Sequence, residues 1–139
     1  MTAIATYQGA AGIGQSVSGR ALVASDGFSA RYDLDRIKGI FSRPTHKLVG
    51  QSYIGQVLVL DIAKGGVATA WMLHEMVTMG KAPLALLLNH ANPVMAQGAA
   101  FADLPLIDRF EVDITAELRS GDLLSVDPAR ARVSLLERP

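Results

Sequence analysis

The feature that most constrains the fold is a short apolar run that leads through a glycine pair into a helical pattern. Residues 57–60 are continuously apolar, residues 61–69 contain Gly65 and Gly66, and residues 70–79 place their large apolar side chains at helical spacing. This segment predicts a buried strand, a glycine loop and an amphipathic helix. The first N–H groups of a helix have no partner within it, and the helix dipole adds positive charge there, so the loop predicts an anion site.

The residues of this loop fit a small anionic ligand. Lys64 supplies a full positive charge, and Thr69 supplies a hydroxyl that could exchange a proton. Outward-pointing backbone donors are expected from the residues between them, which are Gly65, Gly66, Val67 and Ala68. A plain alternative stays open, in which the glycines serve only the turn and Thr69 only caps the helix. A nucleotide P-loop is excluded, because the lysine of that motif follows its second glycine, whereas Lys64 precedes both glycines here.

The chain then continues into a second strand and a second helix, which completes a βαβ unit. Gly80 ends the first helix, and residues 84–88 form an apolar run typical of a strand covered on both faces. Asn92 is the expected N-cap of a helix that begins at Pro93. Asn89 and Asn92 follow the end of the strand, where α/β sheets bind ligands, so both are candidate substrate-binding residues. Capping and turn formation remain the alternative role for both.

Both ends of the chain are rich in strand patterns, which predicts an α/β fold. Outside the βαβ unit, strands are expected at residues 3–7, 19–25, 28–34, 123–126 and 132–136. Residues 9–14 separate the first two strands, and residues 37–54 predict irregular structure over the core. A short helical turn is expected at residues 114–118. Together these patterns predict one domain over residues 1–139, with a mixed sheet or half-barrel and helices packed on one side.

Composition narrows the classes of function. The 13 basic and 13 acidic residues cancel without any block of like charge, so neither nucleic acid nor an anionic membrane is an expected partner. No apolar run approaches the ~20 residues of a membrane span, and we expect a soluble, cytoplasmic chain. The sequence has no cysteine, so thiolate ligands to any metal centre must come from another chain. His46, His74 and His90 show no metal-ligand spacing, and we expect no metal on this chain.

Four segments, taken in order, resemble the small, swivelling-domain component of aconitase X enzymes. They are GQSYIGQVLV at residues 50–59, KGGVAT at 64–69, GKAP at 80–83, and residues 89–102. The resemblance runs through nearly the whole chain and implies a swivelling β/β/α domain that closes over an active site built mainly by a larger subunit. It also implies a dehydratase reaction, in which water is eliminated from a hydroxy acid. An iron–sulfur cluster or mononuclear iron centre is then expected in the large partner subunit.

Two branches of this family differ in the glycine loop. The phosphomevalonate dehydratases have a serine-rich loop, whereas Thr69 is the only hydroxyl residue here, and the loop resembles that of cis-3-hydroxy-L-proline dehydratases. The resemblance therefore implies a two-subunit enzyme acting on cis-3-hydroxy-L-proline. Lys64 and the following N–H groups would hold the substrate carboxylate, and Thr69 would be the catalytic hydroxyl. The alternatives are a phosphomevalonate dehydratase small subunit, a regulatory module that binds a small anion without catalysis, and a purely structural subunit.

Overall fold

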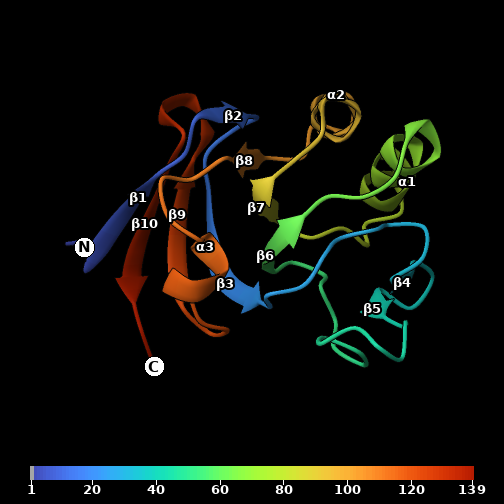
Figure 1. Cartoon of the computed structure of the whole chain (residues 1–139), viewed down its shortest axis with the longest axis horizontal. Coiled ribbons are helices and arrows are strands. Elements are labelled where there is room, and N and C mark those ends of the chain that lie inside the picture. Colours follow the sequence, from blue (N-terminus) through green and yellow to red (C-terminus); the bar gives the residue numbers. More distant parts are fainter. Residues whose placement is uncertain (1) are drawn as a thin grey trace.

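A computed structural model describes residues 2–139 as a strongly curled β-sheet with two long helices on one side (Figure 1). The sheet has eight strands in the order β1-β10-β9-β3-β6-β7-β8-β2. They are β1 (Ala5–Gln8), β2 (Ala11–Ile13), β3 (Val17–Val23), β6 (Val57–Ile62), β7 (Ala85–His90), β8 (Leu106–Asp108), β9 (Leu123–Asp127) and β10 (Arg132–Glu137). Strands β4 (Leu34–Asp35) and β5 (Ile40–Phe41) pair separately. The helices are α1 (Val67–Thr78), α2 (Pro93–Ala102) and the single turn α3 (Ile114–Glu117), with a 3-10 turn at Pro128–Arg130. The predicted mixed sheet is confirmed.

The two ends of the sheet meet in one bent stretch of chain. Strand β1 pairs with β10 and strand β2 pairs with β8, and only Gly9 and Ala10 separate β1 from β2. The Gly9 N–H donates to the Ala131 carbonyl at 2.7 Å, and the Ala10 N–H donates to the Asp108 carbonyl at 3.1 Å. Backbone hydrogen bonding therefore continues around the bend, which gives the half-barrel its curl.

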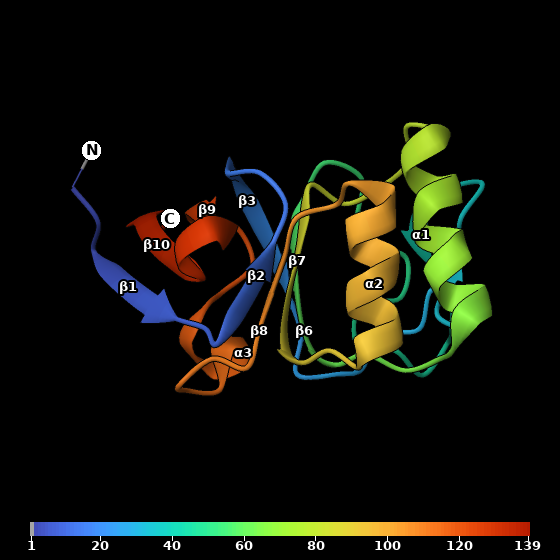
Figure 2. The same cartoon turned by 90° about the horizontal axis from the view of Figure 1, so that it is seen from above.

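The parallel strands lie between the two helices on one side and strands β1, β9 and β10 on the other (Figure 2), and each of their faces carries a separate core. Strands β3, β6, β7 and β8 are parallel neighbours, and successive side chains of a strand point to opposite faces. The face toward α1 and α2 presents Leu58, Leu60, Leu86 and Leu88. The face inside the curled sheet presents Val57, Val59, Leu87 and Ile107. The continuous apolar runs of β6 and β7 are thus explained by burial on both faces.

The predicted βαβ unit is confirmed, with a small change at the start of its helix. Strands β6 and β7 pair in parallel, and α1 connects them. The helix begins at Val67 rather than at residue 70, because Gly66 is its N-cap. It ends as predicted, with Gly80 in the left-handed region at φ +70°. The predicted hairpin of β9 and β10 is also confirmed, as is the helical turn near residue 114.

The prediction of a strand at residues 28–34 is wrong. Phe28 makes one isolated bridge to Ala63, after which the chain turns. The Ser29 N–H donates to Oδ2 of Asp33, and the Asp33 N–H donates back to the Ser29 carbonyl, both at 2.9 Å. Such local bonds compete with strand pairing, so an alternating pattern forms a turn here. Residues 9–14, expected only to separate two strands, contain β2.

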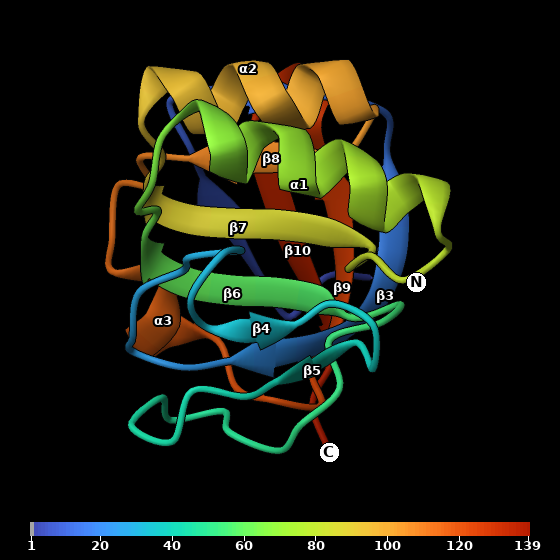
Figure 3. The same cartoon turned by 90° about the vertical axis from the view of Figure 1, so that its right-hand side faces the viewer.

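The irregular segment between β3 and β6 lies beside the helices on the same face of the sheet (Figure 3). It is mostly turns, as predicted, and it buries Phe41, Leu48 and Tyr53 against the core under the helices. Burial raises the pKa of Tyr53 to about 12. This segment therefore covers the part of the sheet that α1 and α2 leave open. No helix among residues 2–139 has the length and apolar character needed to cross a bilayer.

Candidate anion-binding site

The site lies at the carboxyl edge of the parallel strands, where the segment after β3 meets the glycine loop after β6. The Phe28 N–H donates to the Ile62 carbonyl at 2.9 Å, and the Lys64 N–H donates to the Phe28 carbonyl at 2.8 Å. These bonds extend the pairing of β3 and β6 beyond the strands. Two loops that are distant in sequence are thereby held side by side.

Helix α1 starts at this edge without a side-chain cap. Its N-cap is Gly66, whereas the side chain of Asn92 caps α2. Within residues 2–139, no hydrogen bond is donated by the N–H groups of Gly65, Gly66, Val67 or Ala68. These donors and the helix dipole favour a negative charge, as the sequence predicted for this loop.

A hollow of about 360 Å³ opens beside the glycine loop. It is lined by Ser29, Tyr32, Asp33, Arg43, Lys64 and Gly65. The Lys64 side chain is exposed and crosses over Gly27, where an added Cβ would lie 3.2 Å from Cε and 3.6 Å from Nζ. In the described part of the chain the Lys64 ammonium forms no ion pair or hydrogen bond, so its charge faces the hollow without a counter-ion.

Arg43 enters the same hollow from the segment after β5. Its Nε lies 2.8 Å from Oδ1 of Asp33, and its Nη2 lies 3.9 Å from Oδ1 of Asp26. The Asp33 side chain is only 4% exposed, and its other oxygen accepts the Ser29 N–H. A buried carboxylate thus fixes the guanidinium through Nε, and Nη1 makes no hydrogen bond or ion pair with any residue from 2 to 139.

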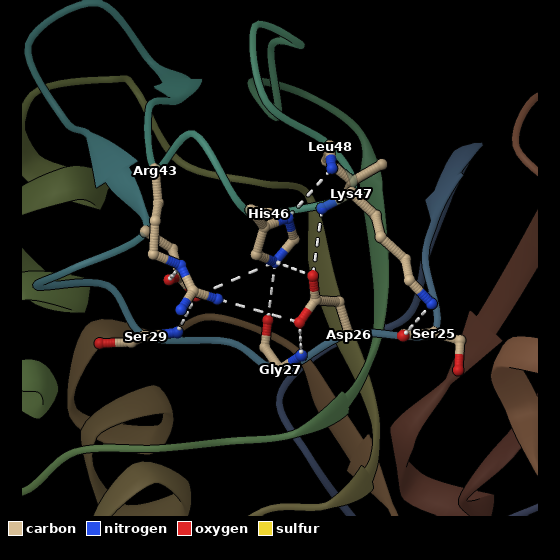
Figure 4. Close-up of polar contacts among 9 residues, drawn as sticks. Ser25, Asp26, Gly27, Ser29, Arg43, His46, Lys47 and Leu48 are labelled. Atoms are coloured by element: carbon tan, nitrogen blue, oxygen red, sulfur yellow. Dashed lines mark hydrogen bonds and ion pairs between the residues drawn. The ribbon is translucent and has the colours of Figure 1, made fainter.

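A buried histidine holds the loop that Lys64 crosses (Figure 4). The His46 side chain is fully buried, with Nε2 at 2.9 Å from the Gly27 carbonyl and Nδ1 at 3.0 Å from the Leu48 N–H. A backbone N–H can only donate to Nδ1, so the proton of the ring is on Nε2 and the imidazole is neutral. The ring also stacks on Phe41, with 4.5 Å between the ring centres. These hydrogen bonds therefore fix both the position of the loop at Gly27 and the tautomer of His46.

Asp26 completes this network on the far side of His46. Its carboxylate accepts the N–H groups of Gly27 at 2.8 Å and Lys47 at 3.1 Å. Burial alone would raise the pKa of Asp26, but these backbone hydrogen bonds outweigh burial and lower it. Asp26 is therefore ionised at neutral pH.

Comparison with known proteins places this architecture in a family. The family described as the aconitase X swivel domain matches residues 6–135, which is nearly all of the 139 residues. The chain belongs to the aconitase X swivel domain family. The glycine loop, the hollow and the network around His46 are therefore features of an aconitase X swivel domain.

Curated relatives and solved structures agree with this assignment. The phosphomevalonate dehydratase small subunit of Methanopyrus kandleri is 32% identical over 114 residues, covering 82% of this chain and 84% of that protein. The protein of the same name from Methanosarcina acetivorans is 29% identical over 119 residues, covering 86% and 83%. The crystal structure of Thermococcus kodakaraensis aconitase X in its holo-form matches with a TM-score of 0.88 at 26% identity, over 96% of this chain and 99% of that chain. A UPF0107 protein solved by solution NMR has a TM-score of 0.84 at 26% identity, over 96% and 100%.

The swivel domain places Thr69 behind the glycine loop rather than in the hollow. Thr69 is 2% exposed in the first turn of α1. Gly65 has φ +108°, and a Cβ at that position would overlap Oγ1 of Thr69. Only glycine fits this close approach. Val67 and Ala68 are exposed at the start of the helix, next to the free N–H groups.

The two predicted asparagines use their polar atoms within the chain. Asn89 donates to Asp61 at 2.9 Å and to Asp113 at 2.8 Å, and it accepts the Ile114 N–H at 2.9 Å. Hydrogen bonds from Thr115 and Asn89 lower the pKa of Asp113. Asn89 thus joins β7 to β6 and α3, and it does not line the hollow.

Asn92 supports the glycine loop from behind. Its Oδ1 caps α2, and its Nδ2 lies 3.4 Å from the Gly65 carbonyl and 3.5 Å from the Ala63 carbonyl. The structure therefore assigns it the capping role that the sequence left open. Across residues 2–139, no three His, Asp or Glu side chains are arranged so that they could hold a metal ion, and the sequence has no cysteine to supply a thiolate.

Proposed function

We propose that this chain is the small subunit of a two-subunit aconitase X-type dehydratase, which eliminates water from a hydroxy acid together with a large subunit. The observation that carries the proposal is that Lys64, Gly65 and Arg43 line one hollow beside the uncapped start of α1. These groups are hydrogen-bond donors suited to a carboxylate. They make half of a substrate site, which is what a swivel domain would bring to a larger catalytic subunit.

The substrate we propose is cis-3-hydroxy-L-proline, because the loop has a single hydroxyl residue at Thr69 and lacks the serines of the phosphomevalonate branch. Phosphomevalonate is the second candidate. It is favoured by the names of the relatives from Methanopyrus kandleri and Methanosarcina acetivorans, which are phosphomevalonate dehydratase small subunits.

Each group of the loop has a role in this proposal. Lys64 and the N–H groups of Gly65, Gly66, Val67 and Ala68 hold the substrate carboxylate. Asn92 supports the loop at the Gly65 carbonyl, and Asn89 holds the neighbouring strand ends together. Thr69 orients or exchanges a proton, although an alcohol needs strong activation to act as a base. Because Thr69 lies behind Gly65, this role requires the Gly65 turn to move when the two subunits close. The iron–sulfur cluster or mononuclear iron belongs to the large subunit.

An exposed apolar patch on the helices supports a subunit role. Trp71 and Phe101 are 58% and 60% exposed, and their ring centres lie 5.2 Å apart across α1 and α2. Val67, which follows the glycine loop, is 66% exposed. Together with Trp71 and Phe101 it lines a second hollow, of about 230 Å³, separate from the one beside Lys64. An apolar surface next to the site is suited to packing against a partner.

Substitution of Lys64 in the assembled enzyme tests the proposed site. Lys64→Ala should raise KM at least about tenfold with a smaller effect on kcat, because a charge-assisted contact to the substrate is lost. Lys38→Ala is the matched control, since Lys38 is also exposed and its ammonium has no partner among residues 2–139. An unchanged KM for Lys64→Ala contradicts the carboxylate role. A chain that binds the anion but never assembles with a large subunit indicates a regulatory module instead.

A further inference from the structure

Two cationic side chains reach the hollow from distant parts of the sequence, and only one of them lies in the glycine loop. Lys64 comes from that loop, whereas Arg43 comes from the irregular segment between β5 and β6. Asp33 forms an ion pair with Arg43 at Nε, and Nη2 lies 3.9 Å from Asp26, which is beyond hydrogen-bond distance, so Nη1 and Nη2 are both available as parallel donors. Arg43 is thus preorganised to bind a carboxylate in a bidentate manner.

The charges around the hollow cancel. Asp26 and Asp33 are negative, Arg43 and Lys64 are positive, and His46 is neutral because its Nδ1 accepts a backbone N–H. A phosphate monoester carries about −1.5 to −2 charges at pH 7 and would leave this group of charges with a net negative charge. A carboxylate that is accompanied by an ammonium group adds no net charge.

We infer that Arg43 is a substrate-binding residue and that Arg43 and Lys64 together select the carboxylate of an amino-acid zwitterion over a phosphate. The inference names the substrate class of the proposed site, so the identity of the bound ligand as the substrate rests on the proposed function. It assigns Arg43 a role that the sequence pattern alone does not reveal.

An NMR titration of the full chain tests this inference without turnover. A similar chain has been solved alone in solution, so amide spectra of this chain are a practical readout. L-proline serves as the zwitterionic probe and inorganic phosphate as the anionic probe, and the amides of Ser29 and Gly65 report on the hollow. We expect saturable shifts with L-proline, and affinity at least about tenfold weaker in Arg43→Gln.

Two further variants keep the test interpretable. Arg132→Gln removes an exposed arginine on β10 that has no ion pair with residues 2–139, and it should bind L-proline like the wild type. Lys64→Gln should also weaken binding of L-proline, and it leaves the buried Asp33 with its Arg43 partner. This variant therefore still tests the inference if Arg43→Gln does not fold. The inference is overturned if neither amide shifts saturably, if Arg43→Gln and Lys64→Gln bind L-proline as tightly as the wild type, or if phosphate binds this hollow more tightly than L-proline.

Failure of this inference can be told apart from failure of the proposed function. A complex with the large subunit that dehydrates its substrate with the same KM in wild type and Arg43→Gln overturns only the inference. Arg43-dependent binding of L-proline by a chain that never yields a dehydratase overturns only the proposed function.

Discussion

Removal of the His46 side chain should destabilise the chain far more than its position in an irregular segment suggests. His46→Ala leaves the half-buried Gly27 carbonyl and the buried Leu48 N–H without their hydrogen-bond partner. Each unsatisfied group costs about 1–3 kcal/mol, and the lost stacking on Phe41 adds about 0.5–1.5 kcal/mol. These costs add to about 2.5–7.5 kcal/mol. Because the Gly27 carbonyl is only half-buried, we expect the free energy of unfolding to fall by an amount in the lower half of that range, about 3–5 kcal/mol, a large fraction of the ~5–15 kcal/mol typical of a domain.

Urea unfolding followed by circular dichroism measures this loss directly. The midpoint should drop without a large change in slope, and the melting temperature should fall by about 10–20 °C. His90→Ala is the matched control, because His90 is exposed at the end of β7 and should change stability by no more than about 0.5 kcal/mol. A loss below about 1 kcal/mol for His46→Ala would refute the reasoning, since it would mean that solvent or a neighbour satisfies both backbone groups.

Three further predictions concern the glycine loop and a buried ion pair. Gly65→Ala should cost about 1–3 kcal/mol in urea unfolding because of its positive φ and the overlap behind it, whereas Gly66→Ala, which faces open space, should be nearly neutral; equal costs would contradict this. Thr69→Val should lower kcat of the assembled enzyme about 10²-fold or more while Thr69→Ser retains activity, and full activity of Thr69→Val would remove the proposed proton role. Burial alone would raise the pKa of Asp122, but hydrogen bonds, above all from Arg138, outweigh burial and lower it below the 3.8 expected for the unfolded chain. The stability this pair supplies is present above about pH 4 and lost as the pH falls further, so the gap in urea midpoint between wild type and Arg138→Gln should narrow below pH 4; a constant gap would contradict the linkage.

The parts of the fold that the sequence predicted are those set by local periodicity. The apolar run of β6, the glycine pair, the helical spacing of α1 and the Asn92-Pro93 start of α2 are each encoded within a few residues. Strand β8 escaped prediction because it has three residues and follows Pro105, which interrupts the apolar run around it. Residues 28–34 misled the prediction because Ser29 and Asp33 bond to each other's backbone.

The site was predicted only in part, for a related reason. Lys64 and the free N–H groups follow from the glycine loop itself, but Arg43 and His46 reach the site through a long irregular segment whose path depends on tertiary contacts. A weak signal was present in the sequence. Asp26-Gly27 is a typical turn dipeptide, and Arg43 and His46 are polar residues in a segment without any strand or helix pattern. Thr69 shows the opposite case, because its spacing placed it near the ligand while the close approach of Gly65 buries it.

Reconstitution tests the central claim most directly. This chain is co-expressed under anaerobic conditions with a large aconitase X-type subunit, and dehydration of cis-3-hydroxy-L-proline is assayed with each chain alone as the control. The account predicts dehydration by the mixture and none by either chain alone. A stable complex that dehydrates phosphomevalonate but not cis-3-hydroxy-L-proline would contradict the substrate assignment, and two chains that do not associate would contradict the subunit role.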